Sequence, residues 1–391
     1  MTIIMLKVFG NGLSDWRSFM IRQVYQNETV LNASRRRISY VFDEYDNIVV
    51  SISGGKDSTV LAHLALKEAN KRGRKIGLFF LDEEVVYDST IKQIEYLMNL
   101  FPNNTIKLWY QIEFRLTNAT SLKEGQLICW EAGKHKIWMR QKNKESIQHK
   151  SWDKEKETVR DKNKGFGFYD VLDNFQNNRP NTAFMVGLRA VESMNRWRAV
   201  SKNPGYKKCF WSTKLQNGSA AFYPIYDFNF HDIWKYIYDE GLKYSKIYDY
   251  MWKKGTPLNE IRVSSLIHEK SFKALVDLPE FEPKTYDRLL KRIDGISIGS
   301  IYGKDRTMLK AQKLPKNYRN WREYRNFLLA TYPDADKKTI FEKRYAHQLD
   351  NDYVARQQCR QLILNDYENN LPIDNKPDPR MEELEKWREI L

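Results

Sequence analysis

The sequence predicts an α/β protein with a doubly wound, mostly parallel sheet, followed by a mainly helical C-terminal region. Apolar runs rich in β-branched residues alternate with segments of helical periodicity along the first two thirds of the chain. Strands that alternate with helices imply parallel pairing and right-handed crossovers. Ligands bind such sheets at the carboxyl ends of the strands, so the loops after Ser51 and Leu81 are the first places to search for a site.

The expected elements follow in order. Residues 14–45 have helical spacing, and the apolar run at 47–53 indicates a buried strand. The next helix begins near Ser58 and ends in a basic turn with Gly73 as its C-cap. The remaining predictions are strands at 76–81, 105–114 and 182–188, helices at 88–101, 169–175 and 231–240, and a short strand before the last of these helices.

Three parts are predicted along the chain. These are an N-terminal extension at 1–29, a nucleotide-binding domain at 30–256 and a mainly helical domain at 257–391. A basic stretch at about 130–164, rich in Lys, Trp and Gln, interrupts the second part. It indicates either a mobile basic lid or a disordered insertion.

Composition restricts the classes of protein to consider. The 391 residues carry a net charge of +15, which favours polyanionic partners such as nucleotides, nucleic acid or an anionic membrane surface. The three cysteines form no CxxC pair, which argues against a disulfide framework, a zinc site and an iron–sulfur cluster. Without a basic leader or an uninterrupted apolar stretch of ~18 residues, we expect a cytoplasmic protein that does not span a membrane.

The strongest functional pattern is the phosphate loop, residues 51–59, which reads SISGGKDST between an apolar strand and an amphipathic helix. Adjacent glycines allow a sharp turn and a close approach of backbone to ligand. Successive backbone amides and a helix N-terminus then attract a phosphate. Lys56 adds a cation, Ser53 and Ser58 add hydroxyls, and Asp57 orients the loop or holds Mg²⁺. The plainer interpretation is a Ser/Gly turn in which Ser58 caps the helix. The GxxxxGK[ST] pattern of a Walker A loop is absent.

The loop resembles the signature of the PP-loop ATP pyrophosphatase superfamily. Three more segments resemble the phosphoadenosine phosphosulfate (PAPS) reductase family: residues 79–91, the GLRAVES stretch at 187–193, and YPIYD at 223–227 with HDIW at 231–234. Residues 262–270 resemble a narrower branch that includes immunoglobulin-binding regulator A, which implies a ParB-like partner protein.

The resemblance and the chemistry of the side chains together give the candidate site. The expected cofactors are ATP or PAPS, with Mg²⁺ at Asp57. Lys56, Asp57 and Arg189 are the catalytic candidates. Arg196, Arg198, Asp227 and Asp232 are candidates for the second substrate. The predicted nucleotide-binding residues are Ser51, Ser53, Gly54, Gly55, Lys56, Asp57, Ser58, Thr59, Asp82, Gly187, Arg189, Glu192 and Ser193.

Several of these residues have an equally simple structural interpretation. Arg189 can pair with Glu192 at the surface, and Asp82 and Asp232 can be acids in the first turn of a helix. His268 and Glu269 offer a proton-transfer pair, although neighbours on a helix do not face the same way.

One feature of the PAPS reductases is missing from the sequence, namely their short C-terminal motif with a nucleophilic cysteine. Cys359 stands in a basic helical stretch without those surroundings. Three hypotheses remain open. They are ATP-dependent adenylation of an acceptor with release of pyrophosphate, sulfonucleotide reduction of the PAPS reductase type, and a nucleotide-sensing regulator associated with DNA.

Overall fold

The computed structural model describes residues 3–5, 23–121, 125–148, 167–201, 205–258, 261–268, 271–296, 314–367, 369, 371 and 373–378. Residues 6–22 of the predicted N-terminal extension, residues 149–164 of the predicted basic insertion, and Glu269 of the predicted proton-transfer pair lie outside this part of the chain.

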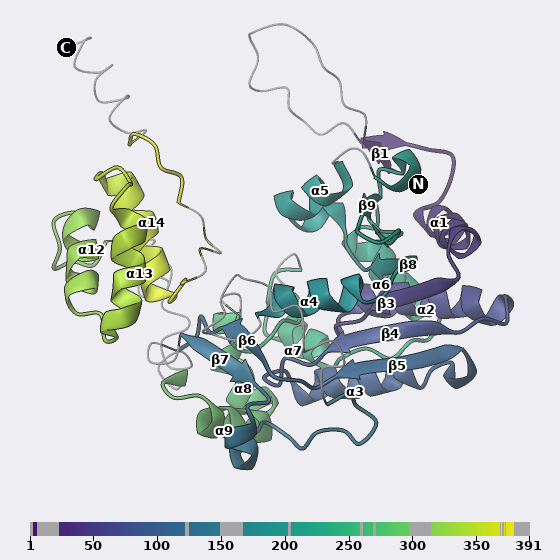
Figure 1. Cartoon of the computed structure of the whole chain (residues 1–391), viewed down its shortest axis with the longest axis horizontal. Helices are drawn as coiled ribbons and strands as arrows, with labels where there is room; N and C mark the ends of the chain where they lie inside the picture. Colours follow the sequence, from purple (N-terminus) through teal and green to yellow (C-terminus); the bar gives the residue numbers. More distant parts are fainter. Residues whose placement is uncertain are drawn as a thin grey trace, which may run out of the picture.

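A six-stranded sheet forms the centre of the molecule (Figure 1). Its order is β5-β4-β3-β8-β10-β9, and every pair is parallel except β10 with β9. The predicted doubly wound, mostly parallel sheet is therefore confirmed. The strands are β3 (Asn47–Ser51), β4 (Ile76–Leu81), β5 (Thr105–Tyr110), β8 (Thr182–Val186), β9 (Ser212–Lys214) and β10 (Ala220–Phe222).

Alternate residues of the central strands supply two separate cores. Val50 and Phe80 belong to one apolar cluster, whereas Val49 and Phe79 belong to the other, as expected for a strand buried on both faces. The first cluster is completed by α1 (Val30–Glu44), α2 (Lys56–Lys71), α3 (Asp88–Met98) and α6 (Phe230–Asp239). The second is completed by α4 (Phe168–Asn177), α7 (Ile247–Lys253), α8 (Phe272–Phe281) and α9 (Pro283–Arg292).

The first helix is shorter than predicted. Helix α1 begins at Val30 because the Thr29 hydroxyl caps it, accepting a hydrogen bond from the Asn32 amide at 3.2 Å. Within the stretch predicted as helix, residues Gln23–Tyr25 form strand β2, which pairs with β1 (Ile3–Met5). Periodicity alone did not locate this boundary.

Residues 130–148 of the predicted basic insertion pack against the domain. A hairpin of β6 (Phe114–Thr117) and β7 (Gln126–Cys129) leads into this stretch. Trp130 and Met139 are each 1% exposed and belong to the core beneath the sheet. For this half of the insertion, the expectation of a mobile or disordered segment is wrong.

The C-terminal region is mainly helical, as predicted, and falls into two structural parts. Residues 261–296 contribute Leu266, Leu275 and Leu289 to the core under the sheet. Helices α12 (Trp321–Ala330), α13 (Ala335–Tyr345) and α14 (Asp352–Ile363) instead form clusters of their own, apart from the sheet in Figure 1. No helix in the described ranges has the length and apolarity needed to cross a bilayer.

Candidate functional site

The phosphate loop turns from β3 into α2 at the carboxyl edge of the sheet. Gly54 has a φ of +71°, and a Cβ atom at this position would lie 2.8 Å from Cγ2 of Thr90. Only glycine adopts this turn at this contact without strain. Gly55 is the N-cap of α2 and provides no side-chain cap. The helix starts at Lys56 rather than near Ser58, and its N-cap residue contributes no capping side chain.

The hydroxyl groups of the loop hold its shape. The Ser58 hydroxyl donates to the Gly55 carbonyl at 3.0 Å and accepts from the Ser53 amide at 3.1 Å. The Thr59 hydroxyl donates to the same carbonyl at 2.9 Å. Ser53 is the exposed member of the set, with Oγ 3.2 Å from that of Ser58. Ser53 is thus the hydroxyl best placed to meet a ligand, whereas Ser58 and Thr59 preorganise the turn.

Gly187 allows strand β8 to approach the first turn of α2. A Cβ atom on Gly187 would lie 3.1 Å from the Ser58 amide nitrogen and 3.2 Å from the Asp57 carbonyl. The glycine therefore sets the spacing between the phosphate loop and the chain that leads to Arg189.

Lys56 is buried at the first position of α2, with only 3% of its surface exposed. Its ammonium lies 3.1 Å from Asp57 Oδ2 and 5.6 Å from the centre of the Tyr248 ring. Burial lowers the pKa of Lys56, and the Asp57 carboxylate opposes that shift. Lys56 is thus a desolvated cation whose one ion-pair partner among the described residues is its neighbour.

Arg189, Glu192 and Arg196 extend the cationic side of the loop. Arg189 Nε lies 2.6 Å from Asp57 Oδ1, and its Nη2 lies 2.8 Å from Glu192 Oε1. Glu192 also pairs with Arg196, whose side chain is 46% exposed. Burial lowers the pKa of Arg196. This geometry connects Asp57, Arg189, Glu192 and Arg196 in one chain of ion pairs, while the roles predicted for Arg189 with the nucleotide and for Arg196 with the second substrate stay predictions.

Lys56 and Arg189 each face one carboxylate oxygen of Asp57 at ion-pair distance, although Asp57 Oδ1 accepts no hydrogen bond from the described residues. Mg²⁺ favours one or two carboxylates together with phosphate oxygens and water. Asp57 shares its charge with two cations in this arrangement, and its predicted role in holding Mg²⁺ stays a prediction. Among the described residues, no group of three or more His, Cys, Asp or Glu is arranged to hold a metal.

Tyr248, which the sequence analysis did not select, reaches the loop from α7. Its hydroxyl accepts a hydrogen bond from the Lys56 amide at 3.0 Å, and the residue is 3% exposed. The hydroxyl thus occupies one of the backbone donors that a phosphate would use. Nothing in the local sequence around residue 248 distinguishes this tyrosine from the other 22.

The predicted nucleotide ligand Asp82 is fully occupied inside the protein. Its carboxylate accepts from Trp109 Nε1 at 3.0 Å, Gln111 Nε2 at 2.9 Å and the Glu84 amide at 3.0 Å, and it pairs with Arg140. The residue has no exposed surface. Its contacts are those of a structural carboxylate, so it is left out of the proposed site.

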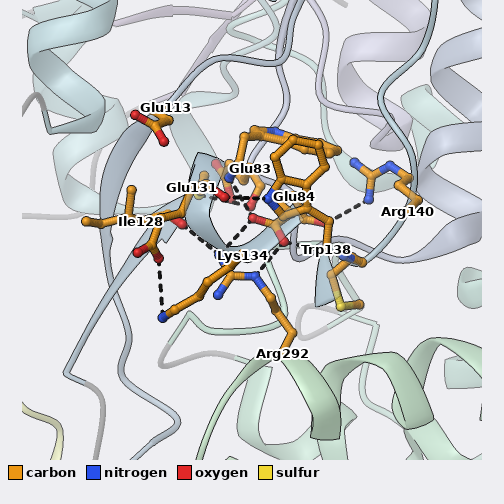
Figure 2. A network of polar contacts seen from close by, with 12 residues as sticks. Glu83, Glu84, Glu113, Ile128, Glu131, Lys134, Trp138, Arg140 and Arg292 are labelled. Atoms are coloured by element: carbon orange, nitrogen blue, oxygen red, sulfur yellow. Dashed lines mark hydrogen bonds and ion pairs between the residues drawn. The ribbon is translucent and has the colours of Figure 1, made fainter. Parts of the chain in front are cut away.

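Glu84 forms a second buried junction beside it, seen in Figure 2. Arg292 from α9 donates to Glu84 Oε1 at 2.6 Å and Oε2 at 3.1 Å, and neither side chain is exposed. The Trp130 amide also donates to Oε2, at 2.6 Å. The acidic turn after β4 therefore fastens α9 and residues 130–140 to the sheet.

The other predicted site residues lie in helix caps, an internal ion pair or open surface. Asp227 accepts two hydrogen bonds of 2.7 Å from Arg37. Asp232 forms the capping box of α6 with Asn229. Ser193 Oγ accepts from the Arg196 amide at 3.3 Å at the start of α5 (Met194–Ser201). Arg198 is exposed, and two residues along a helix place it away from the face of Arg196.

All three cysteines are poorly suited to act as nucleophiles. Burial raises the pKa of Cys209 to about 11 and that of Cys359 to about 12. Burial raises the pKa of Cys129 well above its usual range. Because the thiolate is the reactive form, none of the three is activated in this structure.

The fold and the loop define an α/β protein with a glycine-rich strand-to-helix corner at the carboxyl edge of a mostly parallel sheet. Residues 47–254, more than half of the chain, match the family described as the phosphoadenosine phosphosulfate reductase domain. The chain belongs to this family, which is named after an enzyme. Residues 255–355 match a domain of unknown function (DUF3440).

One curated protein is similar along most of its length. The chain is 29% identical over 326 residues to the uncharacterized protein YbdN of Escherichia coli (strain K12), covering 78% of this chain and 76% of YbdN. The family recognised in the sequence is thus confirmed, whereas its narrower branch stays a prediction.

Two solved structures overlap partly with this fold. The PAPS reductase of Candida auris in its phosphate complex is 12% identical, with a TM-score of 0.33, covering 58% of this chain and 93% of that chain. The FMN adenylyltransferase of Candida glabrata, in complex with FMN and an ATP analogue, is 14% identical, with a TM-score of 0.32 and coverages of 58% and 63%. These overlaps are too low to inform the chemistry of this chain.

Proposed function

We propose that this protein binds ATP at the phosphate loop and transfers the adenylyl group to an acceptor, releasing pyrophosphate. The observation that carries the proposal is the start of α2, where Gly55 supplies no capping side chain and the buried Lys56 stands at the first helical position. A helix N-terminus with adjacent cations binds phosphate oxygens through its amides and its partial positive charge, and here the Lys56 amide becomes available once the Tyr248 hydroxyl is displaced.

In the proposed reaction, an acceptor oxygen attacks the α-phosphorus of ATP. A new oxygen–phosphorus bond forms, and the bond from the α-phosphorus to the bridging oxygen of pyrophosphate breaks. Charge grows on the departing pyrophosphate, which the loop amides, Lys56 and Arg189 are placed to stabilise. No step is assigned to Mg²⁺, because Lys56 and Arg189 already balance the charge of Asp57.

Net charge is the observation that bears on the class of the acceptor. A net charge of +15 supports nucleic acid as the acceptor, because phosphate backbones are drawn to basic surfaces. The ParB-like partner implied by residues 262–270 stays a prediction, as does a purely regulatory use of nucleotide binding.

Sulfonucleotide reduction is the second candidate, and the family match favours it. That reaction requires a thiol that attacks sulfur. The three cysteines all have pKa values raised by burial, which weighs against a thiolate mechanism in this chain. We therefore place adenylation first.

The test is isotope exchange between pyrophosphate and ATP, measured with DNA and RNA acceptors. We expect exchange by the natural protein and a loss of at least about 100-fold in Lys56→Ala, because a charge is removed from the transition state. Lys71→Ala is the matched control, since it removes a lysine from the exposed end of the same helix.

Two results would contradict adenylation. One is ATP binding without exchange for any acceptor. The other is thioredoxin-dependent release of sulfite from PAPS, which would establish the second candidate. Sulfite release that survives replacement of all three cysteines would in turn exclude a cysteine mechanism.

A further inference from the structure

Residues 134–144, here called the basic strip, are rich in positive charge that the proposed reaction does not use. The strip reads KHKIWMRQKNK, with five lysine or arginine side chains and no carboxylate. Two of the five are neutralised by neighbours, since Lys134 pairs with Glu131 and Arg140 pairs with Asp82. Among the described residues, no ion pair joins a carboxylate to the other three, which are Lys136, Lys142 and Lys144.

Buried contacts hold the basic strip at the carboxyl edge of the sheet. The Met139 amide donates to Glu84 Oε1 at 3.3 Å, and Met139 is 1% exposed. Arg140 donates to the Glu84 carbonyl at 2.6 Å. Glu84 belongs to the turn after β4, and the phosphate loop follows β3, the parallel neighbour of β4. Because parallel strands end at the same edge, the strip and the phosphate loop lie along one edge of the sheet.

Trp138 is the aromatic residue of the strip, and its orientation is fixed. Its Nε1 donates to the Glu131 carbonyl at 2.9 Å, and its ring lies edge-on to the buried Trp130 with centroids 5.5 Å apart. Trp138 is partly exposed, and the preceding Ile137 is 39% exposed. Because the polar atom of the indole is already hydrogen-bonded, the ring offers a ligand its apolar surface.

The Lys142 ammonium stands beside both indoles, 5.0 Å from the centre of the Trp138 ring and 5.8 Å from that of Trp130. Burial lowers the pKa of Lys142, and the Glu113 carboxylate opposes that shift. A partly desolvated cation without an ion-pair partner is stabilised by an anion that binds to it. These distances therefore place an unpaired cation and an aromatic surface within reach of one ligand.

From this arrangement we infer that the basic strip is a docking surface for single-stranded nucleic acid, whose phosphates meet Lys136 and Lys142 and whose bases contact Trp138. Cations interleaved with a partly exposed aromatic ring are typical of surfaces that bind single strands without reading their sequence. A duplex hides the faces of its bases, so it would use the charges alone. That the bound strand is also the acceptor rests on the proposed function, whereas its binding does not.

Fluorescence anisotropy with a labelled single-stranded oligonucleotide, in the absence of ATP, tests this surface. We expect the double variant Lys136→Ala/Lys142→Ala to bind about tenfold more weakly, and the slope of log K against log salt to fall by about 1.4, the share of two phosphate contacts on a single strand. Trp138→Ala should weaken binding at least about fivefold, and Trp138→Phe should recover part of that loss, because a phenyl ring still stacks on bases. Binding of the same oligonucleotide as a duplex should be weaker and should not respond to Trp138→Ala.

Lys75→Ala is the matched control, since it removes an exposed lysine one residue before β4, at the opposite edge of the sheet. Thermal unfolding of the lysine variants should match that of the natural protein. The inference is overturned if the double variant binds the oligonucleotide as Lys75→Ala does, or if its loss appears only with phosphatidylserine vesicles, which would assign the surface to a membrane. Strip-dependent oligonucleotide binding without exchange between pyrophosphate and ATP would leave the surface and remove the proposed function. Exchange with an oligonucleotide that the double variant binds normally would leave the proposed function and remove the surface.

Discussion

The conformation of Gly54 is the most specific single-residue requirement at the site. We expect Gly54→Ala to weaken ATP binding at least tenfold, because a methyl group at φ +71° strains the backbone and meets Thr90 at 2.8 Å. Gly73→Ala is the matched control at the far end of α2. Gly73 also has a positive φ, of +63°, but a methyl group added there would have no neighbouring atom within 4 Å. Equal ATP affinity of the two variants would contradict the assignment of the loop.

Glu83 is expected to make stability depend on pH. Burial raises the pKa of Glu83 from 4.5 to about 7, partly opposed by a hydrogen bond from Ser265. An acid with a raised pKa in the folded state contributes stability below pH 4.5, and this contribution disappears as the pH rises through about 7. The loss of unfolding free energy amounts to about 1–3 kcal/mol. This figure is discounted for solvent screening, because part of the Glu83 side chain is exposed.

Glu83→Gln should flatten the change in unfolding free energy between pH 4.5 and 7, measured by urea denaturation. Glu145→Gln replaces an exposed carboxylate and serves as the control. A parallel pH dependence of the two variants would show that Glu83 ionises normally in the folded protein.

At the scale of elements, the ion pair between Asp227 and Arg37 joins α1 to the chain after β10. Both side chains are at most 5% exposed, and removing one partner from a buried pair costs about 3–5 kcal/mol. We therefore expect Asp227→Asn to lower the unfolding free energy by that amount. Asp232→Asn should cost about 1 kcal/mol or less, because the cap of α6 is exposed. An Asp227→Asn protein of natural stability but altered acceptor binding would instead support the substrate role predicted from sequence.

The strand–loop–helix corner was predictable because all of its signals are local. An apolar strand, two glycines and a helical repeat stand within about 25 residues at 47–71. The antiparallel strand β9 and the hairpin of β6 and β7 were missed, since short strands carry little periodic signal. Helix ends such as Val30 depended on a single capping hydroxyl.

The residues of the phosphate loop could be predicted from the sequence, whereas the residues around the loop could be predicted only in part. Sequence reasoning placed Arg189 correctly beside the loop, but it could not show that Asp82 meets Arg140 or that Asp227 meets Arg37, 190 positions away. Carboxylates that end a strand or precede a helix look alike in sequence whether they face solvent or a buried arginine. Tyr248 was missed for the same reason, since its partner is 192 residues distant.

At the scale of the whole molecule, Arg292 joins the C-terminal region to the sheet. Arg292→Ala leaves Glu84 buried without its cation, so we expect a loss of about 3–5 kcal/mol in unfolding free energy. Arg288→Ala, on the same helix, breaks a partly exposed pair with Asp88 and should cost less than about 1 kcal/mol. Urea denaturation measures both. Similar costs for the two variants would mean that the Glu84 junction does not hold α9 in place.

The hydrogen bond from the Lys56 amide to Tyr248 has a practical consequence. A ligand oxygen that takes this amide must displace the phenol, whose ring lies edge-on to Trp234 with centroids 5.3 Å apart. The near-ultraviolet spectrum of a tyrosine–tryptophan pair responds to changes in its hydrogen bonding and geometry. The molecule therefore contains an intrinsic chromophore beside the phosphate loop. Ligand binding at the loop can be followed with it, without an added dye.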